Sequence, residues 1–242
     1  MKAMILAAGL GSRLKPITNK IPKALVEVKG KTLLQHNIER IVSSGISDIV
    51  INVHHFSDKV INYLRENKNF GANIYISDET EMLLDTGGAI KKVSEWLFDD
   101  QPIIIQNVDI YTNIDYHKML DFHLAKGALA TVAVRNRESS RYLMFNNDNE
   151  LCGWQNTNTK EKIITREASK TNNLAFSCTH IMDAKLLSLL PDKKVFSIIE
   201  TYLELSQQYT IAGYLHNNDY WFDIGTPEKL NNLEMFLQKN SK

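Results

Sequence analysis

Residues Leu6–Lys23 read LAAGLGSRLKPITNKIPK, a stretch that joins the end of an apolar segment to a loop containing glycine, arginine, proline and lysine. The residues before and at its start are apolar, so Lys2–Ala8 is predicted to be a buried strand that ends at Gly9. The next ten residues, Gly9–Thr18, are rich in Gly, Ser and Pro and therefore predict a loop. Because ligands in open α/β sheets bind at the carboxyl ends of strands, this loop is the first candidate for a binding site.

Beyond the loop, helical and strand patterns alternate as far as Lys126. Helices are predicted at 32–44, from a cap at Ser57 onward, at 88–97 and at 115–126, and strands at 48–53, 73–77 and 102–106. Such alternation predicts right-handed βαβ units and a mostly parallel sheet flanked by helices. After Gly127 the pattern loosens, and the polar stretch 135–173 is expected to form a small antiparallel lobe. Strands at 128–134, 174–182 and 210–215, and helices at 195–207 and after Thr226, complete the pattern.

Length, charge and cysteine content limit the classes of protein to which this sequence can belong. The 242 residues suit one α/β domain, with a first half at about 1–115 and a more irregular second half at about 116–242. Lys+Arg and Asp+Glu both total 28, so no overall basic field indicates a nucleic acid partner. Cys152 and Cys178 do not form a CxxC pair, and no apolar run is long enough for a membrane span. These features predict a cytoplasmic protein, and they leave its oligomeric state open.

The loop itself has the chemistry of an anion site. Gly9 and Gly11 allow the backbone to bend so that its N–H groups face an anion. Arg13 offers a two-pronged contact to phosphate oxygens and Lys23 adds a compact positive charge. The dinucleotide-binding fingerprint needs glycine where Leu14 stands, and the Walker A sequence Gly-Lys-Ser/Thr is absent, so both of these phosphate loops are excluded.

The full pattern GxGxRxxPxTxxxPK after an LAAG strand resembles the sugar-phosphate nucleotidyltransferases. Further segments match that family in order: DTGGAI at 85–90, Asn107-Val108-Asp109 after the PIIIQ strand, Phe176-Ser177, and WFDIGTPE at 221–228. The resemblance spans nearly the whole chain. It implies a Rossmann-like α/β fold with a sugar-side lobe, in which about 1–115 is the nucleotide-binding half and about 116–242 the sugar-binding half. It also implies an enzyme that joins a nucleoside triphosphate to a sugar 1-phosphate with release of pyrophosphate.

The resemblance also implies a role for individual residues. The catalytic pair would be Arg13 and Lys23, and the metal ligands Asp109 and Asp223, holding Mg²⁺. The residues implied to bind the nucleotide are Ala8, Gly9, Gly11, Ser12, Arg13, Lys23 and Gly88. The acceptor would contact Asn107, Arg141 and Ser177.

Within the family, the chain looks most similar to N-acetylmuramate-1-phosphate uridylyltransferases. The alternatives are GTP with mannose or heptose 1-phosphate, dTTP with glucose 1-phosphate, CTP with phosphocholine, or a catalytically inactive nucleotide-binding module. Two residues depart from the family pattern: Val108 stands where a small residue is usual, and Cys178 stands where glycine is expected. Both departures bear on the shape of the acceptor pocket.

Overall fold

The computed structural model describes residues 1–240, and these residues form two compact units. Unit 1 contains Met1–Leu83, Gln106–Asn113 and the chain from Tyr220 onward, and unit 2 contains Leu84–Ile105 and Ile114–Asp219. The chain passes from unit 2 to unit 1 within strand β6 (Ile103–Asn107). The units do not follow the predicted halves, because Leu84–Ile105 belongs to unit 2 and the chain from Tyr220 onward belongs to unit 1. The binding roles of the two halves stay predictions.

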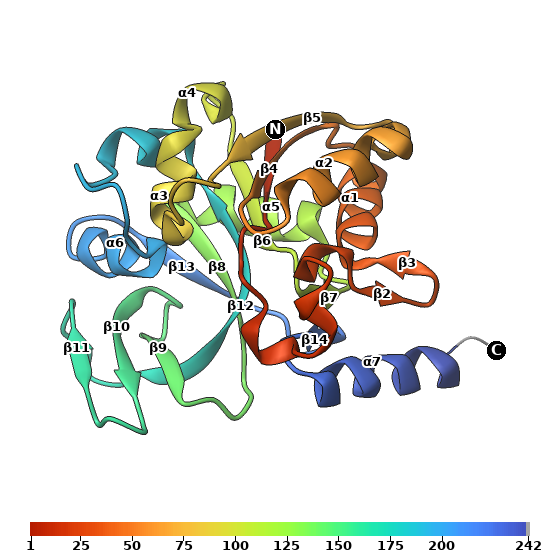
Figure 1. The fold of residues 1–242 in the computed structure, drawn as a ribbon. Coiled ribbons are helices and arrows are strands. Elements are labelled where there is room, and N and C mark those ends of the chain that lie inside the picture. The colour runs from red at the N-terminus through yellow and green to blue at the C-terminus, as the bar shows by residue number, and fades with distance from the viewer. Residues whose placement is uncertain (241–242) are drawn as a thin grey trace. The chain divides into compact units, whose positions relative to one another are not determined.

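Unit 1 is built on a parallel sheet. Its strands β1 (Lys2–Leu6), β4 (Asp48–Val53) and β5 (Asn73–Asp78) pair in register in the order β1-β4-β5. Helices α1 (Leu33–Ser43) and α2 (Ser57–Glu66) flank these strands (Figure 1). The central strand β4 is apolar, and its residues Ile49, Val50 and Ile51 are fully buried. Burial of each such side chain stabilises the fold by roughly 1.5–3 kcal/mol.

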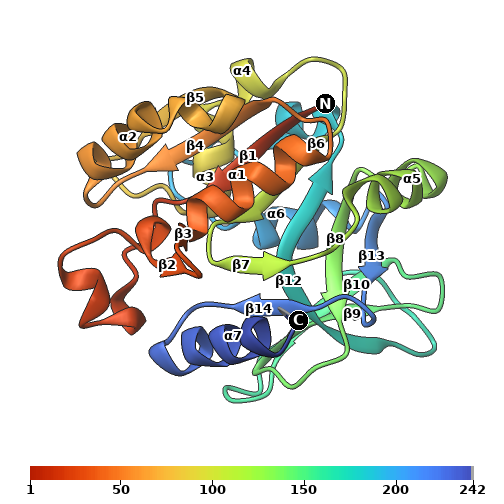
Figure 2. The same cartoon turned by 90° about the vertical axis from the view of Figure 1, so that its right-hand side faces the viewer.

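A second, smaller layer of unit 1 joins segments that are far apart in the sequence. Strand β7 (Ile110–Thr112) pairs antiparallel with β14 (Trp221–Asp223), and α7 (Pro227–Lys239) follows β14 directly. Figure 2 shows α7 running beside β14. A short hairpin of β2 (Glu27–Val28) and β3 (Lys31–Thr32) precedes α1, and 3₁₀ turns occupy Ser12–Leu14, Ile17–Asn19, Lys23–Leu25 and Lys68–Gly71.

Unit 2 has a mixed sheet. Strand β12 (Asn172–Met182) pairs antiparallel with both β8 (Ala130–Arg135) and β9 (Arg141–Phe145), whereas β13 (Ile211–Leu215) is parallel to β8. Beyond β9 lie β10 (Leu151–Asn156) and β11 (Lys162–Ile164), which form the predicted antiparallel lobe. The helices of this unit are α3 (Asp85–Lys92), α4 (Ser94–Leu97), α5 (Tyr116–Lys126) and α6 (Ile198–Leu205), with a 3₁₀ segment at Ala184–Leu189.

The predicted α/β fold is confirmed, and the sheet that was expected to be mostly parallel is mixed and largely parallel, with helices flanking it. Two local predictions are wrong. Ser57 does not cap α2, because Phe56 occupies the cap position in a left-handed conformation with φ 57° and Ser57 is the first helical residue. The helix expected at 88–97 begins earlier, at Asp85, and is interrupted at Val93, whose φ of −112° is not helical.

Candidate active site

The exit of β1 is held by two polar side chains, one near the end of the adjacent strand β4 and one just after β5, which pairs with β4 on its other side. The Ala7 N–H donates to Asn52 Oδ1 at 2.7 Å, and Asn52 Nδ2 donates to Glu79 Oε1 at 2.8 Å. Glu79 is only 2% exposed, so the chain of bonds is shielded from water. Sequence reasoning missed Asn52 and Glu79, although a polar residue at the end of each of two apolar strands was a signal for them. The network holds the start of the glycine-containing loop, where Ala8 is buried, in one position.

Within the loop, Gly11 is the residue that must be glycine. It adopts φ +62°, its carbonyl accepts a 2.8 Å hydrogen bond from Thr18 Oγ1, and a Cβ there would lie 2.9 Å from Thr18 Cγ2. At Gly9 the backbone is not left-handed and a Cβ would meet nothing within 4 Å, so the predicted role of Gly9 stays a prediction. Ser12 and Arg13 follow on an exposed 3₁₀ turn, which is anchored by the buried Leu14.

Lys23 and Asp109 are in direct contact, a pairing that the sequence did not predict. Their side chains form an ion pair and are only 11% and 15% exposed. The backbone before Asp109 is held on both sides, because the Val108 N–H donates to Leu6 O at 3.0 Å and Val108 O accepts from Asn37 Nδ2 at 3.0 Å. The Val108 side chain is 3% exposed and packs in the core.

The β7–β14 ribbon brings Asp223 beside Asp109. Asp223 is in register with Ile110, and the Ile224 N–H donates to Asp109 O at 2.9 Å. Asp223 Oδ2 also lies 2.6 Å from Lys229 Nζ on α7. A Cβ placed on Gly225 would lie 2.9 Å from Asp223 Oδ1 and 3.1 Å from an Arg13 guanidinium nitrogen, so both side chains border the same glycine.

Four of the predicted residues therefore gather at one place: Arg13, Lys23, Asp109 and Asp223. Two carboxylates suit Mg²⁺, which prefers a few carboxylate ligands and keeps its other positions for water and phosphate oxygens. Among residues 1–240 there is no group of three or more His, Cys, Asp and Glu side chains placed to hold a metal ion by themselves. A pair of carboxylates fits an ion whose other ligands are water and phosphate oxygens. Asn107, the last residue of β6, is half-buried just before this cluster.

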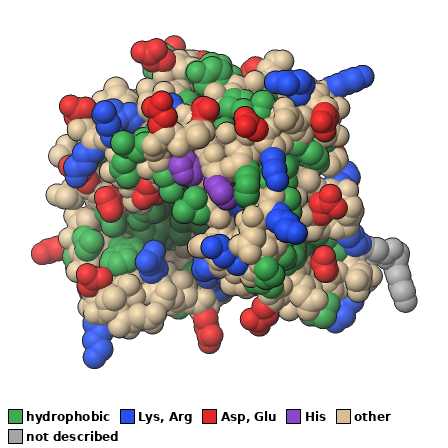
Figure 3. All heavy atoms as spheres, in the orientation of Figure 1, with side chains coloured by type: hydrophobic (Ala, Val, Ile, Leu, Met, Phe, Trp, Pro, Cys, Tyr) green, Lys and Arg blue, Asp and Glu red, His purple; other side chains and the backbone are tan. Residues whose placement is uncertain are grey.

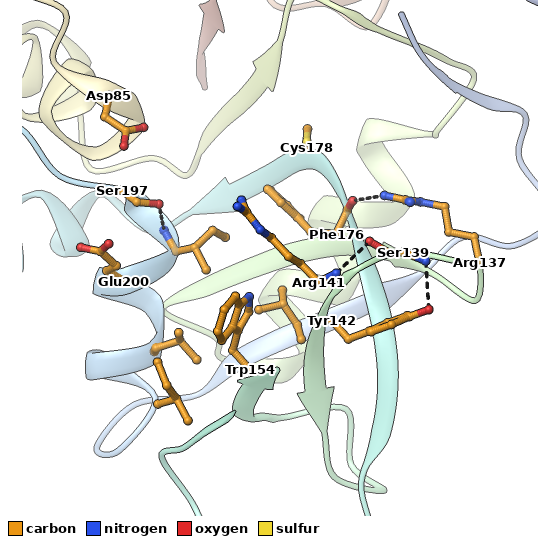
Figure 4. A pocket seen from close by; sticks show the side chains of 14 residues that line it. Asp85, Arg137, Ser139, Arg141, Tyr142, Trp154, Phe176, Cys178, Ser197 and Glu200 are labelled. Atoms are coloured by element: carbon orange, nitrogen blue, oxygen red, sulfur yellow. Dashed lines mark hydrogen bonds between the residues drawn. The ribbon is translucent and has the colours of Figure 1, made fainter. Parts of the chain in front are cut away.

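Unit 2 contains a pocket of about 620 Å³. The face over α6 and β9–β12 is hollowed and lined by hydrophobic side chains (Figure 3). Trp154 and Phe176 supply aromatic surface, and Arg141 reaches toward the middle of the pocket with Asp85 and Glu200 to one side (Figure 4). Among the described residues, the Arg141 guanidinium forms no ion pair with an acidic side chain.

The residues of β12 that line this pocket are not the one predicted, Ser177. Its pairing with β8 slips between Phe176 and His180, and within this bulge Cys178 adopts φ +57°. Phe176 and Cys178 line the pocket, whereas Ser177 is fully buried with its hydroxyl 2.7 Å from His216 Nε2. The left-handed backbone at position 178 explains why glycine is usual there, and Cys178 adds a thiol to the pocket wall.

The glycine segment of α3 is tightly packed within unit 2. The N–H groups of Gly87 and Gly88 both point to Phe196 O, at 2.9 and 3.3 Å. A Cβ on Gly88 would lie 2.1 Å from Lys194 O, closer than any side chain tolerates. Gly88 therefore has a packing role, and its predicted contact with the nucleotide stays a prediction.

Burial displaces the pKa of two groups next to these sites. It lowers the pKa of His180 to about 3, so His180 is neutral at pH 7 and pairs with Tyr202 Oη at 2.5 Å beneath the pocket strand. Burial also raises the pKa of Tyr111 in the β7–β14 ribbon, which keeps its phenol protonated. Neither group provides a base at neutral pH.

Comparison with known proteins identifies the class. The family model for nucleotidyl transferases matches residues 2–240, and the chain therefore belongs to the nucleotidyl transferase family. It is 31% identical to the N-acetylmuramate alpha-1-phosphate uridylyltransferase of Caulobacter vibrioides over 93% of this chain and 92% of that protein. It is 29% identical to the mannose-1-phosphate guanyltransferase of Candida albicans over 94% of this chain, which spans 62% of that protein's length.

Solved structures share the fold. HddC of Yersinia pseudotuberculosis, complexed with GMP-PN, superimposes with a TM-score of 0.77 at 22% identity and covers 98% of this chain and 99% of its own. A putative glucose-1-phosphate thymidylyltransferase of Bacillus anthracis gives a TM-score of 0.79 at 18% identity, over 98% and 94% of the two chains. No helix within residues 1–240 has the length and apolar character needed to cross a membrane.

Proposed function

We propose that this protein transfers a nucleotidyl group from a nucleoside triphosphate to a sugar 1-phosphate, with Mg²⁺, and releases pyrophosphate. The observation that carries the proposal is the meeting of Arg13, Lys23, Asp109 and Asp223 around the glycine-containing loop of unit 1. Two phosphorylated substrates repel each other, so a site that combines them needs several cations held in fixed positions. This cluster has the required composition.

The chemistry requires one bond to form and one to break. An oxygen of the sugar phosphate attacks the α-phosphorus in line, and the bond from that phosphorus to the β-phosphate oxygen breaks as pyrophosphate leaves. Lys23 stabilises the charge that develops on the α-phosphate, and Arg13 holds the departing phosphates through its two-pronged contact. Asp109 and Asp223 would hold Mg²⁺, which supplies charge neutralisation on the phosphates. The acceptor phosphate is itself the nucleophile, so no protein nucleophile is needed.

For the substrates, we propose UTP and N-acetylmuramate 1-phosphate. Support comes from the 31% identity to a uridylyltransferase of that name over more than nine-tenths of both chains. The pocket of unit 2 adds an independent reason, because N-acetylmuramate carries a lactyl carboxylate and Arg141 lines the pocket without an acidic partner among the described residues. The two unbridged cysteines fit a reducing cytoplasm, where both substrates would be found.

A second candidate is GTP with mannose 1-phosphate, favoured by the 29% identity to a guanyltransferase. Pyrophosphate release should be measured for UTP, GTP, dTTP and CTP, each with the 1-phosphates of N-acetylmuramate, N-acetylglucosamine, mannose, heptose and glucose, and with phosphocholine. We expect the fastest release with UTP and N-acetylmuramate 1-phosphate. A guanyltransferase would respond to GTP and mannose 1-phosphate instead, and an inactive module would release no pyrophosphate with any pair.

Arg141→Ala should lower kcat/KM for N-acetylmuramate 1-phosphate about tenfold to a hundredfold, because a charge-assisted hydrogen bond is worth roughly 1.5–3 kcal/mol. N-acetylglucosamine 1-phosphate lacks only the lactyl group and serves as the matched control. Its kcat/KM should change by less than about threefold. Equal losses on both acceptors would show that Arg141 supports the pocket or a phosphate rather than the carboxylate.

A further inference from the structure

Both carboxylates of the candidate metal site are already paired with lysines. Lys23 pairs with Asp109, and Lys229 Nζ lies 2.6 Å from Asp223 Oδ2. The first lysine belongs to the predicted phosphate loop, whereas Lys229 has no part in the function proposed above. Its side chain is 45% exposed and that of Asp223 is 23% exposed, so the pair is accessible to solvent and to an incoming ion.

The position of Lys229 in α7 is unfavourable for a lysine. Thr226 caps the helix, and its Oγ1 accepts from the Lys229 N–H at 3.3 Å, which places Lys229 in the first helical turn. A positive side chain there opposes the helix dipole, whose amino-terminal end is also positive. The helix does not favour a lysine at this position, and the contact that offsets the cost is the ion pair with Asp223.

We propose that Lys229 holds the Asp223 carboxylate until Mg²⁺ binds, and that the ion then displaces the lysine from Asp223. The inference rests on the function proposed above. Mg²⁺ binds carboxylate oxygens at about 2.0–2.1 Å, so an ion at Asp223 Oδ2 and an ammonium 2.6 Å from that oxygen would repel each other strongly. The displaced ammonium remains attached to α7, which begins two residues after Gly225, the glycine that Arg13 borders. It is then free to meet the phosphates that accompany the ion.

The exchange predicts that metal binding and nucleotide binding are coupled. If the metal binds only when Asp223 is not paired with Lys229, its apparent affinity equals the intrinsic affinity multiplied by the fraction of unpaired Asp223. Phosphate oxygens relieve this reduction because they accept the released lysine. Free protein should therefore bind the ion weakly, and the nucleotide should strengthen its binding.

The test is a titration of the whole protein with Mn²⁺ in the absence of nucleotide. The electron paramagnetic resonance signal of the unbound ion measures how much Mn²⁺ remains free. Lys229→Met should bind Mn²⁺ about two- to fivefold more tightly than the wild type, as expected for loss of a competing surface ion pair. Lys229→Arg keeps the charge and should stay within about twofold of the wild type. Lys239→Met changes a lysine at the far end of the same helix and should leave Mn²⁺ affinity unaltered.

Asp223→Asn separates the two proposals. This variant should bind Mn²⁺ at least about tenfold more weakly if Asp223 is a metal ligand. If it binds as the wild type does, the metal assignment fails and the exchange fails with it. If it loses the ion while Lys229→Met shows unchanged or weaker affinity, the metal site stands and the exchange alone is overturned.

Discussion

Asp109→Asn should lower kcat by roughly three orders of magnitude or more, because the charge stabilisation that a metal supplies to the transferring phosphate would be lost. The amide keeps the shape of the carboxylate but not its charge, so both the metal and the ion pair with Lys23 are affected. The backbone at position 109 is held by the β7–β14 ribbon and not by the side chain, so the fold should persist. Steady-state pyrophosphate release and a thermal melt would measure the two effects separately.

A matched control is Asp121→Asn, which makes the same chemical change at an exposed position of α5. It should leave kcat and the melting temperature unchanged within error. Loss of Mn²⁺ binding in Asp109→Asn would tie the loss of rate to the metal. An Asp109→Asn protein with a near-normal rate would remove Asp109 from the metal site.

The parallel part of the fold and the phosphate loop were predictable because their signals are local. Apolar runs such as Asp48–Val53 have no alternative to a buried strand, and the observed bounds of β4 agree with the prediction. The loop motif likewise predicts that Arg13 and Lys23 belong to one phosphate-binding loop, because all its residues lie within a short stretch of sequence. The same is true of the cap at Thr226, whose side chain accepts from Lys229 N as a capping residue should.

The parts that were missed depend on long-range pairing. Strands β7 and β14 have three residues each, too few for a pattern to appear, yet their pairing places Asp223 beside Asp109. Lys229 lacked any sequence signal because its role is defined only by that neighbour. The side chains of β12 were misplaced for a related reason, since a bulge decides which residues face the pocket and sequence alternation does not reveal a bulge.

The second large effect concerns the two cations of the loop. Lys23→Ala should lower kcat about a hundredfold to a thousandfold with a smaller change in the KM for the nucleotide, because its charge acts on the α-phosphate as the bond breaks. Arg13→Ala should instead raise the KM for the nucleotide as well as lower kcat, because Arg13 is expected to hold the β- and γ-phosphates before and during the reaction. Initial rates at varied nucleotide concentration separate these two patterns.

Two further variants test whether the effects at Arg13 and Lys23 depend on the geometry of the side chain or only on its positive charge. Arg13→Lys keeps the charge and loses the planar fork, so it should recover only part of the affinity lost in Arg13→Ala. Lys15→Ala removes an exposed lysine from the same loop and should leave both constants unaltered, which controls for the general loss of positive charge.

Lys23 has a second function that Arg13 lacks, since it neutralises Asp109 in the free protein. Lys23→Ala should therefore bind Mn²⁺ more tightly while turning over more slowly, a combination that simple unfolding does not produce. Small and equal effects of Arg13→Ala and Lys23→Ala would show that this loop does not hold the phosphates.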